Sequence, residues 1–187
     1  INLSLAPEGW EPGDRLVIPE TAQSPIKKKR PEDLDQTEVR SIRSAGQTLG
    51  LDQPFLHDHP KSADNPFGYS VTPHVGNLTR SVTFASQNPS GVRGHGFFAM
   101  MADIDIENAA FVAMGRTRAD APVDDTVLAD DGSVLHLGTN QVARYPIHLH
   151  HTMQPAIVSG CVVEDGLKWG VVIHNSSNNI ISSNVVY

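Results

Sequence analysis

The sequence predicts an all-β protein of the parallel β-helix class, in which short strands wind into stacked coils. From Gly68 onward, β-rich runs alternate with Gly, Asn and Ser turns, and no amphipathic helix of about ten or more residues interrupts them. The C-terminal segment also repeats itself after a shift of 24 residues. With 39% hydrophobic and 19% charged residues, the chain has the composition of a folded domain.

The repeat is the observation that selects a solenoid among all-β folds. Equivalent residues of successive coils stack on one another in such a fold, and one coil needs about this many residues. The shift of 24 places these residues on one another: Ile147 on Val171, Leu149 on Ile173, His150 on His174, Ile157 on Ile181, Ser159 on Ser183 and Val162 on Val186. The segment Ile106 to Phe111 resembles Ser182 to Tyr187, which predicts an earlier coil near residues 94–112.

The sequence divides into two regions. Residues 1–66 are interpreted as N-terminal strands and a long polar loop, with a turn at Glu11 to Asp14 and a strand in "RLVIPET". The basic cluster at 27–30 is followed at once by acidic residues and is read as a solvated loop. Residues 67–187 are predicted to form the coils, and an acidic insertion at about 116–143 leaves the solenoid and returns to it. The expected strands of this region lie in "YSVTPHV", "RSVTFAS", "GFFAMM", "DIDIENAAFVAM", "YPIHLHH", "AIVSGCVV", "WGVVIHN" and "NNIISSNVVY".

Charge and composition narrow the classes of partner. The 21 acidic and 14 basic residues give a net charge of −7, which disfavours nucleic acid and anionic membranes as partners. No apolar run is long enough to span a membrane. The start without Met and the strand-like end at Tyr187 predict a fragment of a longer chain, whose open edge would pair with other segments of the same parent protein.

The run "ARYPIHLHH" carries the strongest functional signal. Side chains alternate along a strand, so His148 and His150 face away from Ile147 and Leu149, which belong to the apolar ladder of the core. His148, His150 and His174 are therefore expected to line the outer surface. Neighbouring coils lie about 4.8 Å apart, close enough for these imidazoles to bind one divalent transition metal of the zinc type. The alternative is a row of surface histidines without a ligand.

Further candidates surround this site. His95 is expected near the same edge of the stack as a fourth metal ligand, and His151 is expected in a turn. Asp103 and Asp105 share an outward face with Glu107 and are candidates for binding a sugar or calcium, unless they only solvate the strand. "HDHP", with His57 and His59, is a weaker metal candidate, and the single cysteine, Cys161, is expected to be packed.

The motifs resemble, in order, those of the parallel β-helix family that includes the cell-migration-inducing hyaluronan-binding protein, its transmembrane cell-surface relative and fibrocystin. The similar segments are "WEPGDRLVIPET", "VGNLTRSVTF", "RGHGFFAM", "AFVAMGR", "ARYPIHLHH" and "VVIHNSSNNIISSNVVY". They cover about residues 9–22 and 75–187, and Arg-Tyr-Pro-Ile-His is the most specific of them. The family's histidines match His95, His148, His150 and His174, whereas its histidine before Met-Gly is Ala113 here.

The resemblance implies a right-handed parallel β-helix in a secreted or cell-surface protein with a link to extracellular polysaccharide, and hyaluronan binding and cleavage are ascribed to some members of the family. Together with the histidines it leads to the hypothesis of a polysaccharide depolymerase, of hydrolase or lyase type. Arg144 would bind an acidic or hydroxyl group of the substrate, and in a metal-free variant His148 or His150 would act as acid or base with Tyr145 as partner. The alternative is a non-catalytic glycan-binding or adhesive solenoid.

Overall fold

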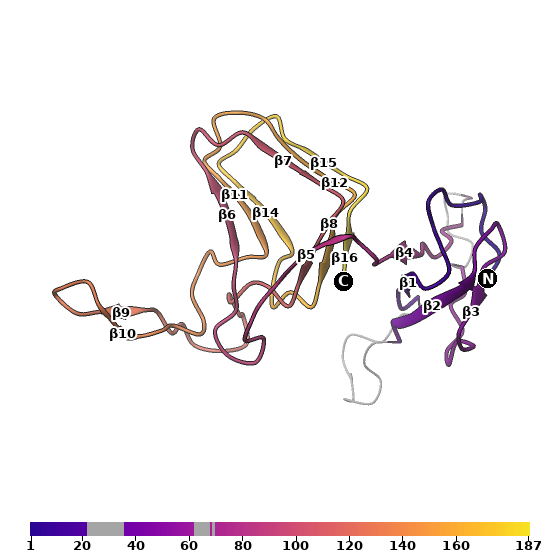
Figure 1. The fold of residues 1–187 in the computed structure, drawn as a ribbon, viewed down its shortest axis with the longest axis horizontal. Helices are drawn as coiled ribbons and strands as arrows, with labels where there is room; N and C mark the ends of the chain where they lie inside the picture. Colours follow the sequence, from indigo (N-terminus) through magenta and orange to yellow (C-terminus); the bar gives the residue numbers. More distant parts are fainter. Residues whose placement is uncertain (22–35, 62–67, 69) are drawn as a thin grey trace. The chain divides into compact units, whose positions relative to one another are not determined.

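A computed structural model describes residues 1–21, 36–61, 68 and 70–187, and these ranges are all-β. The chain divides into two compact units, Ile1–Thr79 and Arg80–Tyr187 (Figure 1). The predicted loop around the basic cluster at 27–30 lies outside the described residues. No helix in the described part of the chain is long and apolar enough to cross a membrane.

The first unit is a small antiparallel sheet. Its strands are β1 (Arg15–Ile18), β2 (Glu38–Ser44), β3 (Gly50–Leu51) and β4 (Gly76–Asn77), in the order β3-β2-β1-β4. Leu16, Ile42 and Leu49 form its buried core. The prediction of a strand in "YSVTPHV" is wrong for residues 70–75, where the chain is irregular. The strand that follows, β4, pairs with β1.

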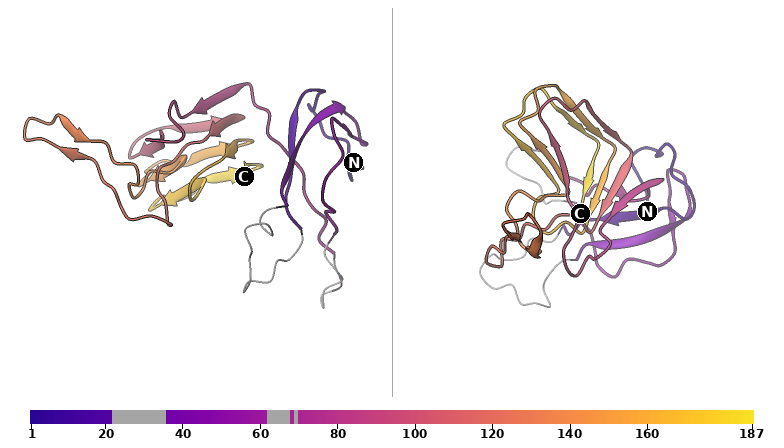
Figure 2. Two further views of the ribbon diagram at one scale, coloured as in Figure 1. Left: turned by 90° about the horizontal axis from the view of Figure 1, so that it is seen from below. Right: turned by 60° about the vertical axis from the view of Figure 1, so that its left-hand side comes forward.

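The second unit consists of three stacked parallel sheets, as the sequence predicts for a β-solenoid (Figures 1 and 2). One full coil runs through one strand of each sheet. The first sheet is β6 (Gly96–Ala99), β11 (Ile147–His150) and β14 (Val171–His174). The second sheet is β7 (Ile104–Glu107), β12 (Ala156–Ser159) and β15 (Ile180–Ser182). The third sheet is β5 (Val82–Ala85), β8 (Ala109–Val112), β13 (Val162–Glu164) and β16 (Val185–Val186).

The coil bends at residues in the left-handed backbone conformation, which stack from coil to coil. Such a residue turns the chain sharply between two strands, and it is tolerated most easily by Gly and Asn. Met100, His151 and Asn175 end the strands of the first sheet, Asn108, Gly160 and Ser183 those of the second, and Ala113 and Asp165 those of the third. The prediction that His151 is a turn residue equivalent to Asn175 is therefore confirmed.

The apolar side chains of the strands fill the interior between the three sheets. Ile147, Leu149 and Val158 are completely buried there. Cys161 is packed in the same cluster, as predicted, with its Sγ 3.4 Å from the carbonyl oxygen of Ile106.

The repeat of 24 residues holds for the first sheet only. Ile147 lies beside Val171 and His150 beside His174, but Ile157 lies beside Ile180 and Val162 beside Val185, a shift of 23. The predicted pairings of Ile157, Ser159 and Val162 with Ile181, Ser183 and Val186 are therefore wrong by one position. The cause is the connection between the two paired positions: six residues separate His150 from Ile157, but only five separate His174 from Ile180.

Between β8 and β11 the chain leaves the solenoid and forms the hairpin of β9 (Val127–Leu128) and β10 (Val134–His136). This hairpin projects from the stacked coils (Figure 2). Its base is fastened by Asp124, which accepts hydrogen bonds from the backbone N–H and hydroxyl of Thr139 and lies 2.6 Å from Nε2 of His136.

Candidate metal centre

Three histidines from two adjacent strands form the candidate metal centre. His148 and His150 lie on β11 and His174 lies on β14, directly beside His150. One ring nitrogen of each lies within 4.8 Å of the corresponding nitrogens of the other two. The rings of His150 and His174 are stacked, with centroids 4.8 Å apart and an interplanar angle of 8°. The coil spacing thus brings the imidazoles together as the sequence predicts.

The three histidines differ in exposure. All lie on the side of the sheet away from Ile147 and Leu149, but only 1% of His148 is exposed, whereas His150 is half-buried and His174 is exposed. The expectation of an open surface is therefore wrong for His148. The rings of Phe97 and Tyr145 cover it, each with its centroid 5.3 Å from the imidazole.

The hydrogen bonds of His148 fix its tautomer. Its Nδ1 lies 3.1 Å from the carbonyl oxygen of Ala143, which can only accept, so Nδ1 carries the proton and Nε2 presents a lone pair. This Nε2 and the Nδ1 of His150 are both buried and have no hydrogen-bond partner in the structure. Buried polar atoms without partners are costly, and a metal ion at this place would satisfy both.

The surroundings of His148 and His150 favour the neutral imidazole, which is the form that binds metals. Burial lowers the pKa of His150, and the neighbouring His148, His151 and His174 lower it further. Burial also lowers the pKa of His148, helped by His174 and Arg144 and opposed by the hydrogen bond to Ala143.

The spacing of the three histidines fits a metal site after a small adjustment. In a tetrahedral zinc site the ligand nitrogens lie about 3.3 Å apart, because each Zn–N bond is about 2.0 to 2.1 Å long. Nitrogens that are up to 4.8 Å apart must therefore move closer, and exposed His174 is free to do so by rotating its side chain. Three protein ligands leave one position for water or substrate, as in catalytic zinc sites.

His95 is not part of this group. Gly96 lies beside Ile147, so Phe97 is in register with His148, and His95 precedes the strand. Its Nδ1 lies 3.2 Å from Nη1 of Arg116. Burial, followed by the charges of Arg116 and Arg144 and the nearby His148, lowers the pKa of His95 to about 4. His95 thus lies in a neighbouring cluster with two arginines and is not one of the three imidazoles that converge.

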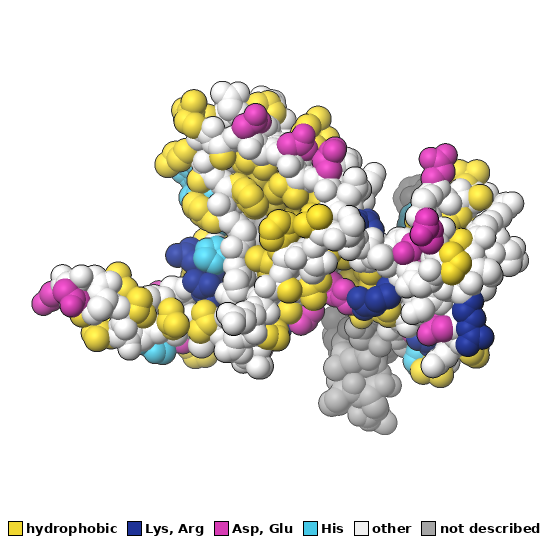
Figure 3. Space-filling model, in the orientation of Figure 1, with side chains coloured by type: hydrophobic (Ala, Val, Ile, Leu, Met, Phe, Trp, Pro, Cys, Tyr) yellow, Lys and Arg dark blue, Asp and Glu magenta, His cyan; other side chains and the backbone are white. Residues whose placement is uncertain are grey.

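Two arginines form this cationic cluster with His95. Burial and the charge of Arg144 lower the pKa of Arg116, whose guanidinium donates to Oε1 of Gln141 and to the carbonyl oxygen of Arg93. Figure 3 shows Lys or Arg side chains next to a histidine between the hairpin and the coils. Arg144 was expected at the site, but sequence reasoning missed Arg116, whose only signal is its position where the insertion begins.

The carboxylates predicted to bind substrate or calcium lie on another sheet. Asp103, Asp105 and Glu107 are exposed, with Asp105 and Glu107 on β7, and Asp105 lies beside Ile157 of β12. In the described ranges, three metal-binding groups converge at the histidines and not at these carboxylates. Their proposed role in binding substrate remains a prediction.

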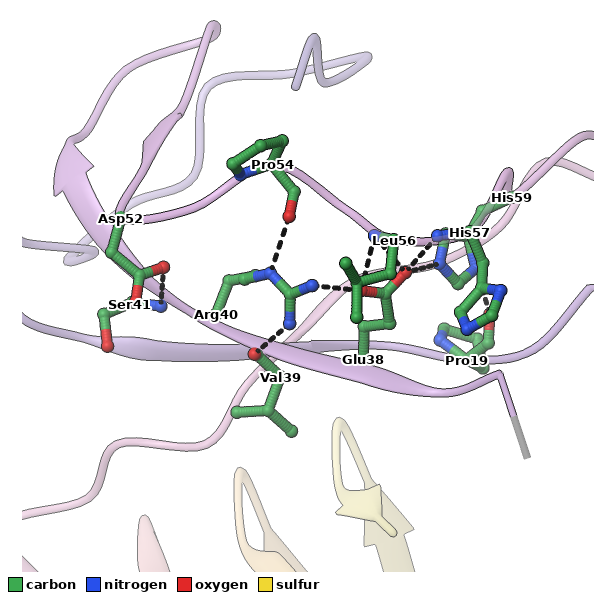
Figure 4. Close-up of polar contacts among 10 residues, drawn as sticks. All are labelled: Pro19, Glu38, Val39, Arg40, Ser41, Asp52, Pro54, Leu56, His57 and His59. Atoms are coloured by element: carbon green, nitrogen blue, oxygen red, sulfur yellow. Dashed lines mark hydrogen bonds and ion pairs between the residues drawn. The ribbon is translucent and has the colours of Figure 1, made fainter. Parts of the chain in front are cut away.

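The "HDHP" segment forms hydrogen bonds within the first unit. Nδ1 of His59 lies 2.9 Å from the carbonyl oxygen of Pro19, and its Nε2 lies 3.2 Å from Oε1 of Glu38 (Figure 4). The backbone N–H of His57 donates to the same carboxylate, which also forms an ion pair with Arg40. Both ring nitrogens of His59 are therefore occupied by the fold.

Glu38 is the buried centre of this network, with 5% of its side chain exposed. Burial raises the pKa of its carboxyl, but the hydrogen bonds from the backbone of Leu56 and His57, from the ring of His59 and the charge of Arg40 outweigh burial and hold the pKa at about 2. The histidines of the "HDHP" segment thus have a structural role, since they bond to Glu38 of β2 and to Pro19.

Comparison of the chain with protein-family models, with curated proteins and with solved structures finds no match. The family suggested by the motifs therefore remains a prediction.

Proposed function

We propose that this chain is a metal-assisted, carbohydrate-active β-solenoid protein that works outside the cell. His148, His150 and His174 would hold a divalent transition metal such as zinc. The observation that carries the proposal is the pair of buried ring nitrogens without partners, Nε2 of His148 and Nδ1 of His150, beside the exposed ring of His174. A metal at this place would act as a Lewis acid or lower the pKa of a bound water.

The neighbouring residues supply binding and proton transfer. Arg144 lies close enough to His148 and His95 to lower the pKa of both, so its guanidinium can hold an acidic or hydroxyl group of a glycan beside the histidines. Cleavage by hydrolysis or by elimination needs a base, and a neutral imidazole serves as one at neutral pH. Tyr145, which packs on His148 and is 7% exposed, would position that ring.

The resemblance to the hyaluronan-binding β-helix family supports a polysaccharide as the ligand, a right-handed coil and a secreted or cell-surface location. The net charge of −7 opposes binding of a polyanion to the protein as a whole. Arg116 and Arg144 offset this charge locally, since they lie close enough to act on each other and on His95.

Metal analysis of purified variants tests the proposal. The chain should bind one zinc equivalent in calorimetry and elemental analysis, and His148→Ala and His174→Ala should each weaken binding by roughly 10- to 100-fold or more. His57→Ala is the matched control, because this exposed histidine lies in the other unit. Zinc affinity that is equal in all four proteins would refute the metal site. Loss of glycan cleavage on addition of a chelator would then establish the role of the metal in catalysis.

One observation favours the second candidate, a non-catalytic glycan-binding or adhesive solenoid. The histidine rings are nearly parallel, with 21° between His148 and His150 and 8° between His150 and His174, as in a packed structural ladder. In that case glycan binding persists in His148→Ala, and no glycan is cleaved with or without metal.

A further inference from the structure

We propose that Trp169 is a stacking subsite for a pyranose ring of the glycan. This inference rests on the proposed carbohydrate function and adds a residue that binds the substrate beside the histidines. The indole is 55% exposed, although it is the largest apolar side chain of its coil. A large exposed aromatic ring next to polar groups is typical of a binding site.

The position of Trp169 in the solenoid places it next to the candidate metal centre. Tyr145 and Trp169 each lie two residues before the paired residues Ile147 and Val171, so they occupy equivalent positions in adjacent coils. Their rings are 5.5 Å apart with an interplanar angle of 38°. The ring of Tyr145 in turn lies 5.3 Å from that of His148. One ring therefore separates the indole from the histidines, and an oligosaccharide lying across Trp169 also reaches them.

The electrostatics of the indole suit a sugar ring. The face of an aromatic ring is electron-rich and attracts positively polarised groups, which include the axial C–H bonds of a pyranose. The ammonium group of Lys168 already lies over this ring, 4.4 Å from its centroid. An exposed cation–π contact is weak, and the lysine side chain is long and flexible, so a sugar can displace it.

Lys168 also indicates which sugars would bind best. A shift of 24 residues puts it in register with Arg144, so cations accompany the two rings in both coils. A displaced ammonium group remains near the edge of the stacked sugar and can pair with a carboxylate or sulfate on it. The subsite would thus accept neutral sugars and prefer acidic ones.

Intrinsic fluorescence tests the subsite directly, because the chain has two tryptophans. In the Trp10→Phe variant of residues 1–187, all tryptophan emission comes from Trp169. Titration with chitohexaose, which is neutral, and with hyaluronan hexasaccharide, which is acidic, should each change this emission in a saturable manner. The change should persist after the metal has been removed with EDTA, since stacking needs no metal.

Calorimetry on variants separates stacking from folding. Trp169→Ala should weaken binding of both oligosaccharides by about fivefold or more, whereas Trp169→Tyr, which keeps a flat ring, should retain most of the affinity. Lys168→Ala should reduce the preference for the acidic hexasaccharide. Unchanged zinc affinity and circular dichroism of Trp169→Ala show that the solenoid is intact.

Absence of an emission change with either hexasaccharide would overturn the inference, as would equal affinities of Trp169→Ala and the unaltered protein. The proposed function fails differently, through absence of zinc binding and of glycan cleavage. A protein that binds zinc and cleaves glycan independently of Trp169 would refute the subsite alone.

Discussion

At the scale of single residues, the tautomer of His148 links the fold to the proposed chemistry. The carbonyl oxygen that accepts from its Nδ1 belongs to Ala143, which has a left-handed backbone conformation with φ of 64°. The chain returning from the insertion thus supplies the group that occupies Nδ1 and leaves Nε2 as the ring nitrogen without a partner. A metal ligand is oriented in this way in many metalloproteins, where a carbonyl or carboxylate holds the other ring nitrogen.

The lowered histidine pKa values predict that acid destabilises the solenoid unit. His95 has a pKa of about 4 in the folded protein and about 6.5 when unfolded. Between these values the unfolded chain binds more protons, so the free energy of unfolding falls as the pH falls from about 6.5 to about 4. His148 and His150 act in the same direction. Thermal melting at pH 7 and pH 5 should show the loss, and His95→Gln should reduce it; a melting temperature independent of pH would contradict this.

The buried position of Glu38 predicts that its removal destabilises the first unit. Glu38→Ala leaves the partly buried Arg40 and two backbone N–H groups without their acceptor. We expect a loss of about 3–5 kcal/mol in the free energy of unfolding, since breaking a buried ion pair leaves an uncompensated charge. Urea denaturation followed through Trp10, which packs on this core, measures it. The exposed Glu8→Ala is the control, and equal stability of the two variants would show that Glu38 is dispensable.

At the scale of elements, the corners determine how the strands stack. A Cβ atom on Gly160 would clash with Oδ1 of Asn108 in the preceding coil, and φ of Gly160 is +62°. Asn108 and Ser183 hold a similar backbone conformation at the equivalent corners, so glycine at position 160 mainly makes room for the side chain of Asn108 and also avoids strain at positive φ.

This corner predicts a pair of coupled substitutions. Gly160→Ala should destabilise the solenoid by about 1–3 kcal/mol through strain at positive φ, and the clash with Asn108 adds to it. Asn108→Gly removes the clashing side chain, so the double variant should recover part of the loss. Thermal denaturation of all four proteins measures the coupling. Additive effects of the two substitutions would show that the contact does not matter.

The strands and their stacking could be read from the sequence because hydrophobic alternation and the repeat reflect the packing directly. Pairing of β11 with β14 was predictable, since Ile147, Leu149 and His150 all have matching partners in the next coil. The slip by one position in the other two sheets was not, because the shorter corner at 175–179 consists of the same Asn and Ser residues as an ordinary turn.

The residues of the candidate metal centre could be predicted only where they lie in the part of the chain that repeats. His148, His150 and His174 follow from it, but the cover over His148 comes from Phe97, which lies in a coil separated from β11 by the insertion. The expectation that His95 lies at the same edge of the stack as the other histidines hid this relation. Pairing of Gly96 with Ile147 could have been found from the apolar match of Phe98 with Leu149.

At the scale of the solenoid unit, the coil of β14, β15 and β16 exposes apolar residues that are in register with the core. Ile173, Ile181 and Val186 lie in register with the core residues Leu149, Val158 and Val163, yet they are 48%, 37% and 58% exposed. Their strands pair on one side only. Unpaired parallel strands with an apolar face favour association with further strands.

These exposed apolar edge strands predict that a protein of residues 1–187 self-associates as its concentration rises. Sedimentation velocity should show larger species at higher concentration, and Ile181→Lys should suppress them, because a charge at the end opposes edge pairing. Val123→Lys, at an exposed apolar residue of the insertion, is the control. Identical sedimentation of all three proteins at every concentration would rule out association through the end of the coil.

The insertion between β8 and β11 makes the protein modular. β11 packs on β6 as closely as β14 packs on β11, although the hairpin stands between β6 and β11 in the chain. Backbone hydrogen bonds from Arg116 and Thr117 to Arg144 hold the two ends of the insertion together at the solenoid. The hairpin is thus separable from the coils: exchanging residues 120–139 for another loop would alter the surface beside the solenoid while the imidazoles of His148, His150 and His174 stay in place.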